Sequence, residues 1–474
     1  MANNVIIIMT DELRRDTLGC YGNPKVKTPN IDKLAQTGYR FNNAYTPSPI
    51  CVPARASIAT GLYVHENRCW TNAMPYSGQS RSWHHELRDS GRDVVSIGKL
   101  HFKSRETSNG FSEEIVPVHV KDGKGWIHGL LRERTDLFDA SGFAENIGPG
   151  TDPYSDYDRK VCELAQEWLV EKSKTSPEGG WCLFLSFLRP HYPLTCPPEF
   201  YEMYNPKDLP QPRQESIPPE LTHPVLKNLQ KACDYDASFT KETRQVAIAS
   251  YYGLCSFVDS LVGKITKTLT DTSLEKTTNI IFTSDHGECL GDRGFWTKMV
   301  MYEEASAVPL IMSGPNISQG VNKAPVSLID LYATVLELVS VRMPKKFPKH
   351  SKSLIDSIKE PIFSRPIISE FHDYGAQTGM FMLRYENWKL IVYPGFRSQL
   401  FNLREDPGEK HDYALGPMHR ETIECLTKIL CSVLDPKKVN LQAFQDQEEK
   451  IAQLGGREGI LSTQNFDHTP VKLE

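Results

Sequence analysis

The chain has 474 residues, 39% of them hydrophobic and 24% charged, which is ordinary globular composition and excludes a coiled coil, a collagen or a disordered chain. Its length allows about two to four domains. Lysine and arginine number 54 against 59 acidic residues, and this net charge of -5 argues against the basic surface that a nucleic acid partner requires.

The sequence gives no sign of export or of a membrane anchor. Val5 to Met9 form an apolar run, but it is too short for a signal peptide, and no basic segment precedes it. Uninterrupted apolar stretches such as Trp181 to Leu188 reach only about eight residues, against the ~18 of a membrane span. We therefore expect a cytoplasmic protein with no membrane contact.

Apolar runs alternate with amphipathic stretches over the first two thirds of the chain. The run Asn4–Met9 predicts a buried parallel strand that ends next to Asp11 and Glu12. Further strands are expected at Val94–Ile97, Cys182–Phe187, Asn279–Thr283 and Pro309–Met312, and helices from Thr28 and over Asp158–Lys172, Val246–Thr268 and Ile329–Val339. This alternation predicts an α/β fold with a large, mostly parallel sheet sandwiched by helices.

The pattern changes after about residue 341. Short strands at Met380–Arg384, Trp388–Tyr393 and Gln399–Leu403 predict a smaller antiparallel sheet, which a helix over Met418–Val433 could cover. The residues that follow are polar and are expected to form a tail or an oligomer contact. We therefore predict a catalytic α/β domain over residues 1–360 and a C-terminal α+β subdomain with a polar tail over 361–474.

The most informative string runs from Ser48 to Gly61 and contains Cys51, Pro53 and Arg55. The 11 cysteines of the chain show no zinc-type spacing, so most are expected to be small buried side chains. A cysteine at a helix N-terminus beside an arginine has a lowered pKa. One interpretation of Cys51 is therefore a thiolate nucleophile.

The pattern Cys51-x-Pro53-x-Arg55 resembles the maturation signature of the sulfatase family, part of the alkaline phosphatase superfamily. The resemblance implies an alkaline-phosphatase-like fold and oxidation of Cys51 to formylglycine by a formylglycine-generating enzyme. It continues through Gly98-Lys99-Leu100-His101, Arg189-Pro190-His191 and Leu290–Lys298. These motifs stand in the order that the family expects.

Acidic residues follow two predicted strands, Asp11 and Glu12 after the first and Asp285 with His286 after a late one. Converging carboxylates repel one another unless a cation lies between them. The resemblance implies one divalent metal, held by Asp11, Glu12, the modified Cys51, Asp285 and His286. Calcium is favoured and manganese or magnesium are the alternatives. Glu12 departs from the commoner Asp-Asp pattern of the family, so its carboxylate lies one methylene further out.

The resemblance also implies roles for the remaining site residues. Lys99 and Lys298 stabilise the sulfate oxygens, and Arg55 fixes the formylglycine. His101 takes a proton from its second hydroxyl and His191 protonates the leaving oxygen. The implied reaction is hydrolysis of a sulfate monoester through a covalent sulfo-enzyme intermediate.

Two alternatives stay open on the sequence. A phosphonate monoester or phosphodiester hydrolase shares the cysteine motif, and a degenerate member would bind sulfated ligands without turnover. Loops at Trp70–Ser82, His119–Arg134 and Glu199–Lys227 are expected to hold the leaving group. Their aromatic and basic residues suit a small-molecule sulfate ester, either a sulfated sugar or an aryl sulfate. His84 and His85 are expected at the surface.

Overall fold

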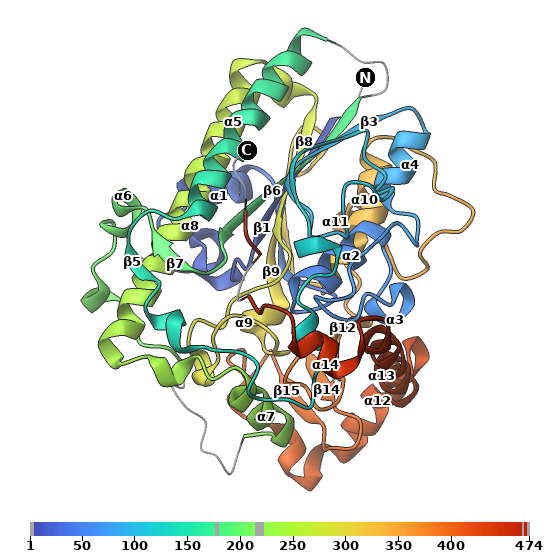
Figure 1. Cartoon of the computed structure of the whole chain (residues 1–474). Coiled ribbons are helices and arrows are strands. Elements are labelled where there is room, and N and C mark those ends of the chain that lie inside the picture. Colours follow the sequence, from blue (N-terminus) through green and yellow to red (C-terminus); the bar gives the residue numbers. More distant parts are fainter. Residues whose placement is uncertain (1–3, 176–179, 214–221, 467–468, 472–474) are drawn as a thin grey trace.

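A nine-stranded sheet forms the centre of the molecule (Figure 1). The computed structural model describes residues 4–175, 180–213, 222–466 and 469–471. The strands lie in the order β10-β2-β9-β8-β1-β6-β3-β4, with β11 beside β2. Only β9 runs antiparallel to its neighbours among the described strands of this sheet. The strands are β1 (Asn4–Asp11), β2 (Tyr39–Tyr45), β3 (Asp93–Lys99), β4 (Glu113–Val118), β6 (Trp181–Pro190), β8 (Thr278–Ser284), β9 (Ala307–Ser313), β10 (Gly320–Asn322) and β11 (Val326–Ser327).

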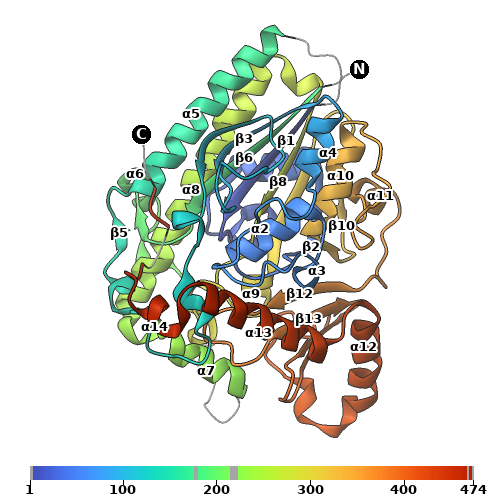
Figure 2. The ribbon, with the colours of Figure 1, turned by 45° about the vertical axis from the view of Figure 1, so that its right-hand side comes forward.

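Helices cover both faces of this sheet, which confirms the predicted α/β class (Figure 2). On β1, Ile6 and Ile8 pack into one hydrophobic cluster and Ile7 and Met9 into another. Successive side chains of a strand point to opposite faces, so this short apolar run supplies both cores. One face carries α1 (Pro29–Thr37), α5 (Pro153–Lys174) and α8 (Lys241–Asp271), and the other α2 (Cys51–Thr60), α4 (Trp83–Asp89), α10 (Leu331–Leu338) and α11 (Leu354–Lys359).

Helix α8 is the one described helix that is long and apolar enough to cross a bilayer. Its most apolar 18-residue window has a mean hydropathy of 1.4, so α8 reaches the length of a membrane span although polar residues interrupt its apolar ones. Of that window, 83% is buried inside the protein. We therefore assign α8 to the core, and the cytoplasmic location stays a prediction.

A second, antiparallel sheet lies next to the first. It contains β12 (Ile367–Phe371), β13 (Met380–Tyr385), β14 (Trp388–Val392) and β15 (Gln399–Asn402) in sequence order. Helix α12 (Arg420–Val433) covers one face through Leu426 and Leu430. The predicted smaller sheet and its helix are therefore confirmed, whereas the domain boundary at residue 360 stays a prediction.

The polar C-terminal residues form two further helices, α13 (Pro436–Gln453) and α14 (Gly456–Leu461). They pack back against the N-terminal part of the chain instead of leaving the molecule (Figure 2). Ala443 packs with Trp70, and the Trp70 indole donates a hydrogen bond of 2.7 Å to Asp446. The chain beyond α14 is thereby brought toward the catalytic part of the molecule.

Candidate active site

The site lies where β1 and β8 end and α2 begins. These two strands pair in parallel, with Thr10 opposite Ser284, so Asp11 and Asp285 follow side by side. Cys51 is the first residue of α2, in which every residue is buried. The carboxyl ends of parallel strands are where open α/β sheets bind ligands. The fold therefore brings the motif residues together from separate parts of the sequence.

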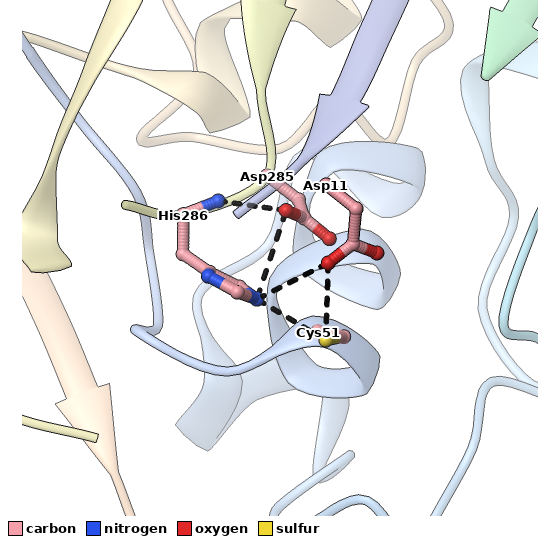
Figure 3. A group of neighbouring side chains, drawn as sticks. All are labelled: Asp11, Cys51, Asp285 and His286. Carbon is pink, nitrogen blue, oxygen red and sulfur yellow. Dashed lines mark hydrogen bonds and ion pairs between the residues drawn. The ribbon is translucent and has the colours of Figure 1, made fainter. Parts of the chain in front are cut away.

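Four of the predicted metal ligands form one group (Figure 3). One donor atom each from Asp11, Cys51, Asp285 and His286 lies within 4.8 Å of the others. The Cys51 sulfur is 3.1 Å from His286 Nε2 and 3.7 Å from Asp11 Oδ1. His286 Nδ1 lies 3.0 Å from the Gly287 carbonyl, so its N–H donates there and the Nε2 lone pair faces the group. Two carboxylates and such an imidazole fit a divalent cation.

Arg55 and Lys99 neutralise the carboxylates of this group. Arg55 Nε donates to Asp285 Oδ2 at 2.8 Å and Nη2 to Asp11 Oδ2 at 3.2 Å, while Lys99 Nζ also contacts Asp11 Oδ2. Burial alone would raise the pKa of Asp11, but Lys99 and Arg55 hold that pKa well below its usual range. Asp11 is therefore ionised and able to bind a cation.

The Cys51 thiol is not an activated thiolate. Burial, followed by the charge of Asp11, raises its pKa to about 12 in spite of the neighbouring lysines. Only 2% of the residue is exposed. A thiol that stays protonated at neutral pH is a poor nucleophile. The structure therefore does not support the thiolate interpretation of the sequence, because desolvation and the charge of Asp11 outweigh Lys298 and Lys99.

Glu12 lies beside the four-residue group and contacts a different set of side chains. Its Oε2 is 2.9 Å from Lys298 Nζ and 3.3 Å from His191 Nε2. Its Oε1 is buried without a hydrogen-bond partner in the described part of the chain. Burial raises the pKa of Glu12 to about 8. Asp11, Glu12 and His191 form a second group with metal-ligand spacing that shares only Asp11 with the first, so the role of Glu12 as a ligand of the same ion stays a prediction.

His191 and Lys298 form a hydrogen-bonded pair. Lys298 Nζ lies 2.7 Å from His191 Nε2, and His191 Nδ1 lies 2.6 Å from the Tyr192 carbonyl. An ammonium can only donate, so Nε2 accepts and Nδ1 carries the ring proton. Burial and the charge of Lys298 hold the pKa of His191 well below its usual range. The imidazole is therefore neutral, and the available proton lies on Lys298.

His101 is also a neutral imidazole. Burial, followed by the charge of Lys99, lowers its pKa well below the usual range. Its Nε2 lies 2.9 Å from the hydroxyl of Thr469, a residue that sequence reasoning did not select. Its Nδ1 is buried without a hydrogen-bond partner in the described residues. That nitrogen is therefore free to take part in chemistry.

One cavity of about 690 Å³, counted to its open mouth, contacts Cys51 and the catalytic candidates other than Arg55. Half of the remaining lining residues are aromatic, namely Trp126, Phe138, Tyr154, Tyr192, Tyr235 and Phe466.

Two of the three predicted substrate loops reach this cavity. Asn72 comes from the loop Trp70–Ser82, and Trp126 comes from His119–Arg134. The described residues of Glu199–Lys227 contribute no side chain to the wall, and residues 214–221 of that loop lie outside the described part of the chain. Tyr154, Tyr235 and Phe466 were missed because nothing in their local sequence distinguishes them from core aromatics.

The comparison with known proteins identifies the family. The sequence matches the family model described as Sulfatase over residues 3–341, and the one described as N-sulphoglucosamine sulphohydrolase, C-terminal, over residues 291–435. The chain belongs to the sulfatase family. It is an enzyme of the sulfatase class, as the cysteine motif predicts.

The relatives of this sulfatase include enzymes with different named substrates. Choline-sulfatase of Rhizobium meliloti (strain 1021) is 30% identical over 87% of this chain and 83% of its own length. Arylsulfatase K of Danio rerio is 31% identical over 92% of this chain and 84% of its own length. Among solved structures, a phosphonate monoester hydrolase from Silicibacter pomeroyi superposes with a TM-score of 0.73 at 25% identity, covering 91% of this chain and 94% of that one.

His84 and His85 correct one expectation about the sulfatase. Both are buried at the start of α4 and neither is at the surface. The His84 ring stacks on Phe111 with the ring centroids 4.0 Å apart, and burial holds its pKa well below the usual range. They are core histidines, which the neighbouring arginine and serine residues concealed in the sequence.

Proposed function

We propose that this sulfatase hydrolyses small-molecule sulfate monoesters with a formylglycine formed from Cys51, through a covalent sulfo-enzyme intermediate. The observation that carries the proposal is the state of Cys51. Its thiol belongs to the metal-ligand group and lies 3.1 Å from His286 Nε2, yet burial raises the pKa of this thiol to about 12. An unmodified thiol would be a poor nucleophile there, whereas an oxidised residue fits the position.

The residues around position 51 fit one divalent cation, and we propose calcium. Asp11, Asp285, His286 and the modified residue 51 would hold it, whereas Glu12 shares a separate group with Asp11 and His191. Hard carboxylate oxygens favour calcium, although the imidazole nitrogen would also suit manganese. When bound, the ion lowers the pKa of a hydroxyl on residue 51 and withdraws charge from the sulfate oxygens.

The hydrated aldehyde of formylglycine supplies one hydroxyl that attacks sulfur and a second whose deprotonation later expels sulfate. Around it, Lys99 and Lys298 contact the cavity and offset the negative charge of the ester. Arg55 holds Asp11 and Asp285 in place, because its Nε donates to Asp285 and its Nη2 donates to Asp11. His101 Nδ1, which has no other partner in the described residues, accepts the proton of the second hydroxyl.

The leaving oxygen needs a proton, and we propose that Lys298, positioned by His191, supplies it. His191 alone is unprotonated on Nε2, because that nitrogen accepts from Lys298. The ammonium is therefore the proton source and donates directly, because the ring proton of His191 on Nδ1 is bound to the Tyr192 carbonyl. This proposal modifies the role of His191 that the family resemblance implied, since His191 positions the ammonium of Lys298 and is not itself the acid.

Mass spectrometry and kinetics test the proposal together. The protein is produced with a formylglycine-generating enzyme, and the peptide that contains residue 51 is weighed. We expect the aldehyde mass, turnover of 4-nitrophenyl sulfate, and a loss of at least about a thousandfold in kcat/KM for Cys51→Ala. An unmodified thiol in a fully active enzyme would contradict the mechanism.

A phosphonate monoester or phosphodiester hydrolase is the second candidate, because the solved phosphonate monoester hydrolase has the same fold at 25% identity. Sulfate monoesters and phosphonate monoesters both carry a single negative charge and have similar shapes. The same lysines and metal ion could therefore bind either substrate. Relative kcat/KM values for 4-nitrophenyl sulfate and 4-nitrophenyl phenylphosphonate decide between them. A preference for the phosphonate would overturn the sulfate ester as the main substrate.

A further inference from the structure

The end of the chain lies against the active-site cavity. We define the tail as the described residues 463–466 and 469–471. The Thr469 hydroxyl is 2.9 Å from His101 Nε2, and the Tyr154 hydroxyl donates to the Thr469 carbonyl at 2.6 Å. Figure 2 shows this dark red segment running from α14 toward α5. The tail thus contacts a catalytic candidate that lies 368 residues earlier in the sequence.

Asn465 and Phe466 attach the tail to the segment from Lys121 to Leu137, which includes the cavity residue Trp126. Trp126 Nε1 donates to Asn465 Oδ1 at 2.8 Å, and Asn465 Nδ2 donates to the Leu137 carbonyl at 2.6 Å. The Phe466 ring lies 4.7 Å from Lys121 Nζ, a cation–π distance. Phe466 and Thr469 both line the cavity. The tail therefore forms part of the substrate-contacting wall.

A second, open groove lies on the other side of the tail. Its volume, counted to the open solvent, is about 1780 Å³. Four lysine, arginine or histidine side chains line it, namely Lys103, Arg105, His119 and Lys121. Two acidic side chains, Glu106 and Asp122, also line it. Val120 contacts both hollows, and Pro470 of the tail contacts the groove. The tail thus lies between the catalytic cavity and a groove with an excess of basic side chains.

We propose that the tail determines substrate size, by closing the catalytic cavity to leaving groups that would extend into the basic groove. With the tail in place, the ester must fit within the aromatic cavity. Without Phe466 and Thr469, a leaving group with a further negative charge could reach Lys121 and Lys103. This inference rests on the proposed sulfatase activity, and it assigns to the tail the selection of small esters over larger polyanionic ones.

The test compares two substrates on the full-length, formylglycine-bearing enzyme and its variants. The substrates are 4-nitrophenyl sulfate and a disaccharide that carries two sulfate esters, one on each sugar. The variants are a truncation after Ser462, Phe466→Ala, and Gln464→Ala as the matched control. Gln464 is exposed in the same segment and does not contact the cavity.

We expect the ratio of kcat/KM for the disaccharide to that for the aryl sulfate to rise about tenfold or more in the truncated enzyme and in Phe466→Ala. Gln464→Ala should keep the wild-type ratio. A ratio unchanged in Phe466→Ala overturns the inference even if the truncated chain fails to fold. A wild-type enzyme that cleaves no sulfate ester overturns the proposed function, whereas an active one with unchanged ratios overturns only the role of the tail.

Discussion

Arg55 is the residue on which the charge balance of the site depends. It is only 3% exposed and pairs with both Asp11 and Asp285, which are fully buried. Buried carboxylates are costly unless they are paired and hydrogen-bonded. The arginine of the cysteine motif is therefore as much a structural partner of the acidic residues as a neighbour of the nucleophile.

Replacing Arg55 by methionine should lower the free energy of unfolding by about 3 kcal/mol, because Asp285 loses its cationic partner and Asp11 keeps only Lys99. Arg55→Lys should be intermediate, since one ammonium cannot reproduce the forked geometry of the guanidinium. Urea unfolding in the presence of a chelator measures both. The control is Arg81→Met, whose side chain is 56% exposed and which should change stability by about 0.5 kcal/mol or less. Equal stability of Arg55→Met and wild type would refute this account of the pairing.

Four non-glycine residues at or beside the site have left-handed backbone conformations. Their φ angles are 65° for Glu12, 56° for His101, 61° for Thr297 and 81° for Met299. Such conformations cost of order 1–3 kcal/mol each and persist only where the surrounding structure fixes them. The sequence identified Glu12 and His101 by their chemistry, but a local pattern of residues does not reveal a strained backbone.

At the scale of elements, Glu370 connects the smaller sheet to the catalytic part of the molecule. It lies on β12 and its Oε1 is 2.7 Å from His65 Nδ1, in the short helix α3 (Val64–Asn67). Burial alone would raise the pKa of Glu370, but His65 and His372 bring it to about 2. The same pairing outweighs burial and raises the pKa of His65.

This pair predicts a pH-dependent contribution to stability. The lowered pKa of Glu370 means that its contribution is complete above about pH 4.5 and is lost as the pH falls toward 2. The raised pKa of His65 means that the contribution of its charge is complete below about pH 6.5 and is lost at higher pH. The stability difference between wild type and Glu370→Gln should therefore be largest near pH 5.5, on the order of 2–3 kcal/mol.

Chemical unfolding from pH 3 to 8 measures that difference. Glu449→Gln, on an exposed position of α13, is the control and should show no comparable maximum. A Glu370→Gln difference that is flat between pH 3 and 6 would contradict the assigned contact.

Local pattern predicted the central elements well and the peripheral ones poorly. The strands β1, β3, β6, β8 and β9 were all expected, because each is a short, nearly continuous apolar run buried on both faces. The strand β2 was missed, since Arg40, Asn42 and Asn43 interrupt its apolar residues. Helix α13 was missed as well, because its few buried side chains are held by residues that lie more than 300 positions earlier in the chain.

At the scale of the whole molecule, the two sheets share a buried interface. Residues from β12, β13, β14 and β15 belong to the same hydrophobic cluster as residues of the catalytic part, such as Tyr45 and Met301. Within it, Lys389 of β14 is fully buried and lies 2.8 Å from Glu303 and 2.9 Å from Glu409. A core shared in this way predicts that the smaller sheet folds as one unit with the rest of the chain, against the predicted boundary at residue 360.

We therefore expect one cooperative thermal transition for the full chain, with equal calorimetric and van't Hoff enthalpies. A fragment of residues 1–360 should be largely unfolded, because it exposes the hydrophobic cluster and leaves Glu303 without Lys389. Differential scanning calorimetry and circular dichroism measure both outcomes. Two separate transitions, or a stably folded fragment, would show that the boundary at residue 360 divides independent domains.

The metal-ligand group also affects the stability of the whole fold, because its donors come from the ends of β1 and β8 and the start of α2. An ion that binds only the folded chain stabilises it by mass action, by about 2.7 kcal/mol at a hundred times its Kd. Calcium added to chelator-treated protein should therefore raise the free energy of unfolding. Magnesium should raise it less, because it demands a more regular octahedral shell.

The controls separate this site from surface binding. Asp285→Asn should remove most of the calcium-dependent stabilisation, whereas Asp271→Asn, at a side chain that is 58% exposed, should keep it. If manganese stabilises the protein more than calcium does, the imidazole of His286 outweighs the two carboxylates in selecting the ion. If no divalent ion changes the stability of wild type, then Arg55 and Lys99 already neutralise the carboxylates fully, and the group is not a metal site.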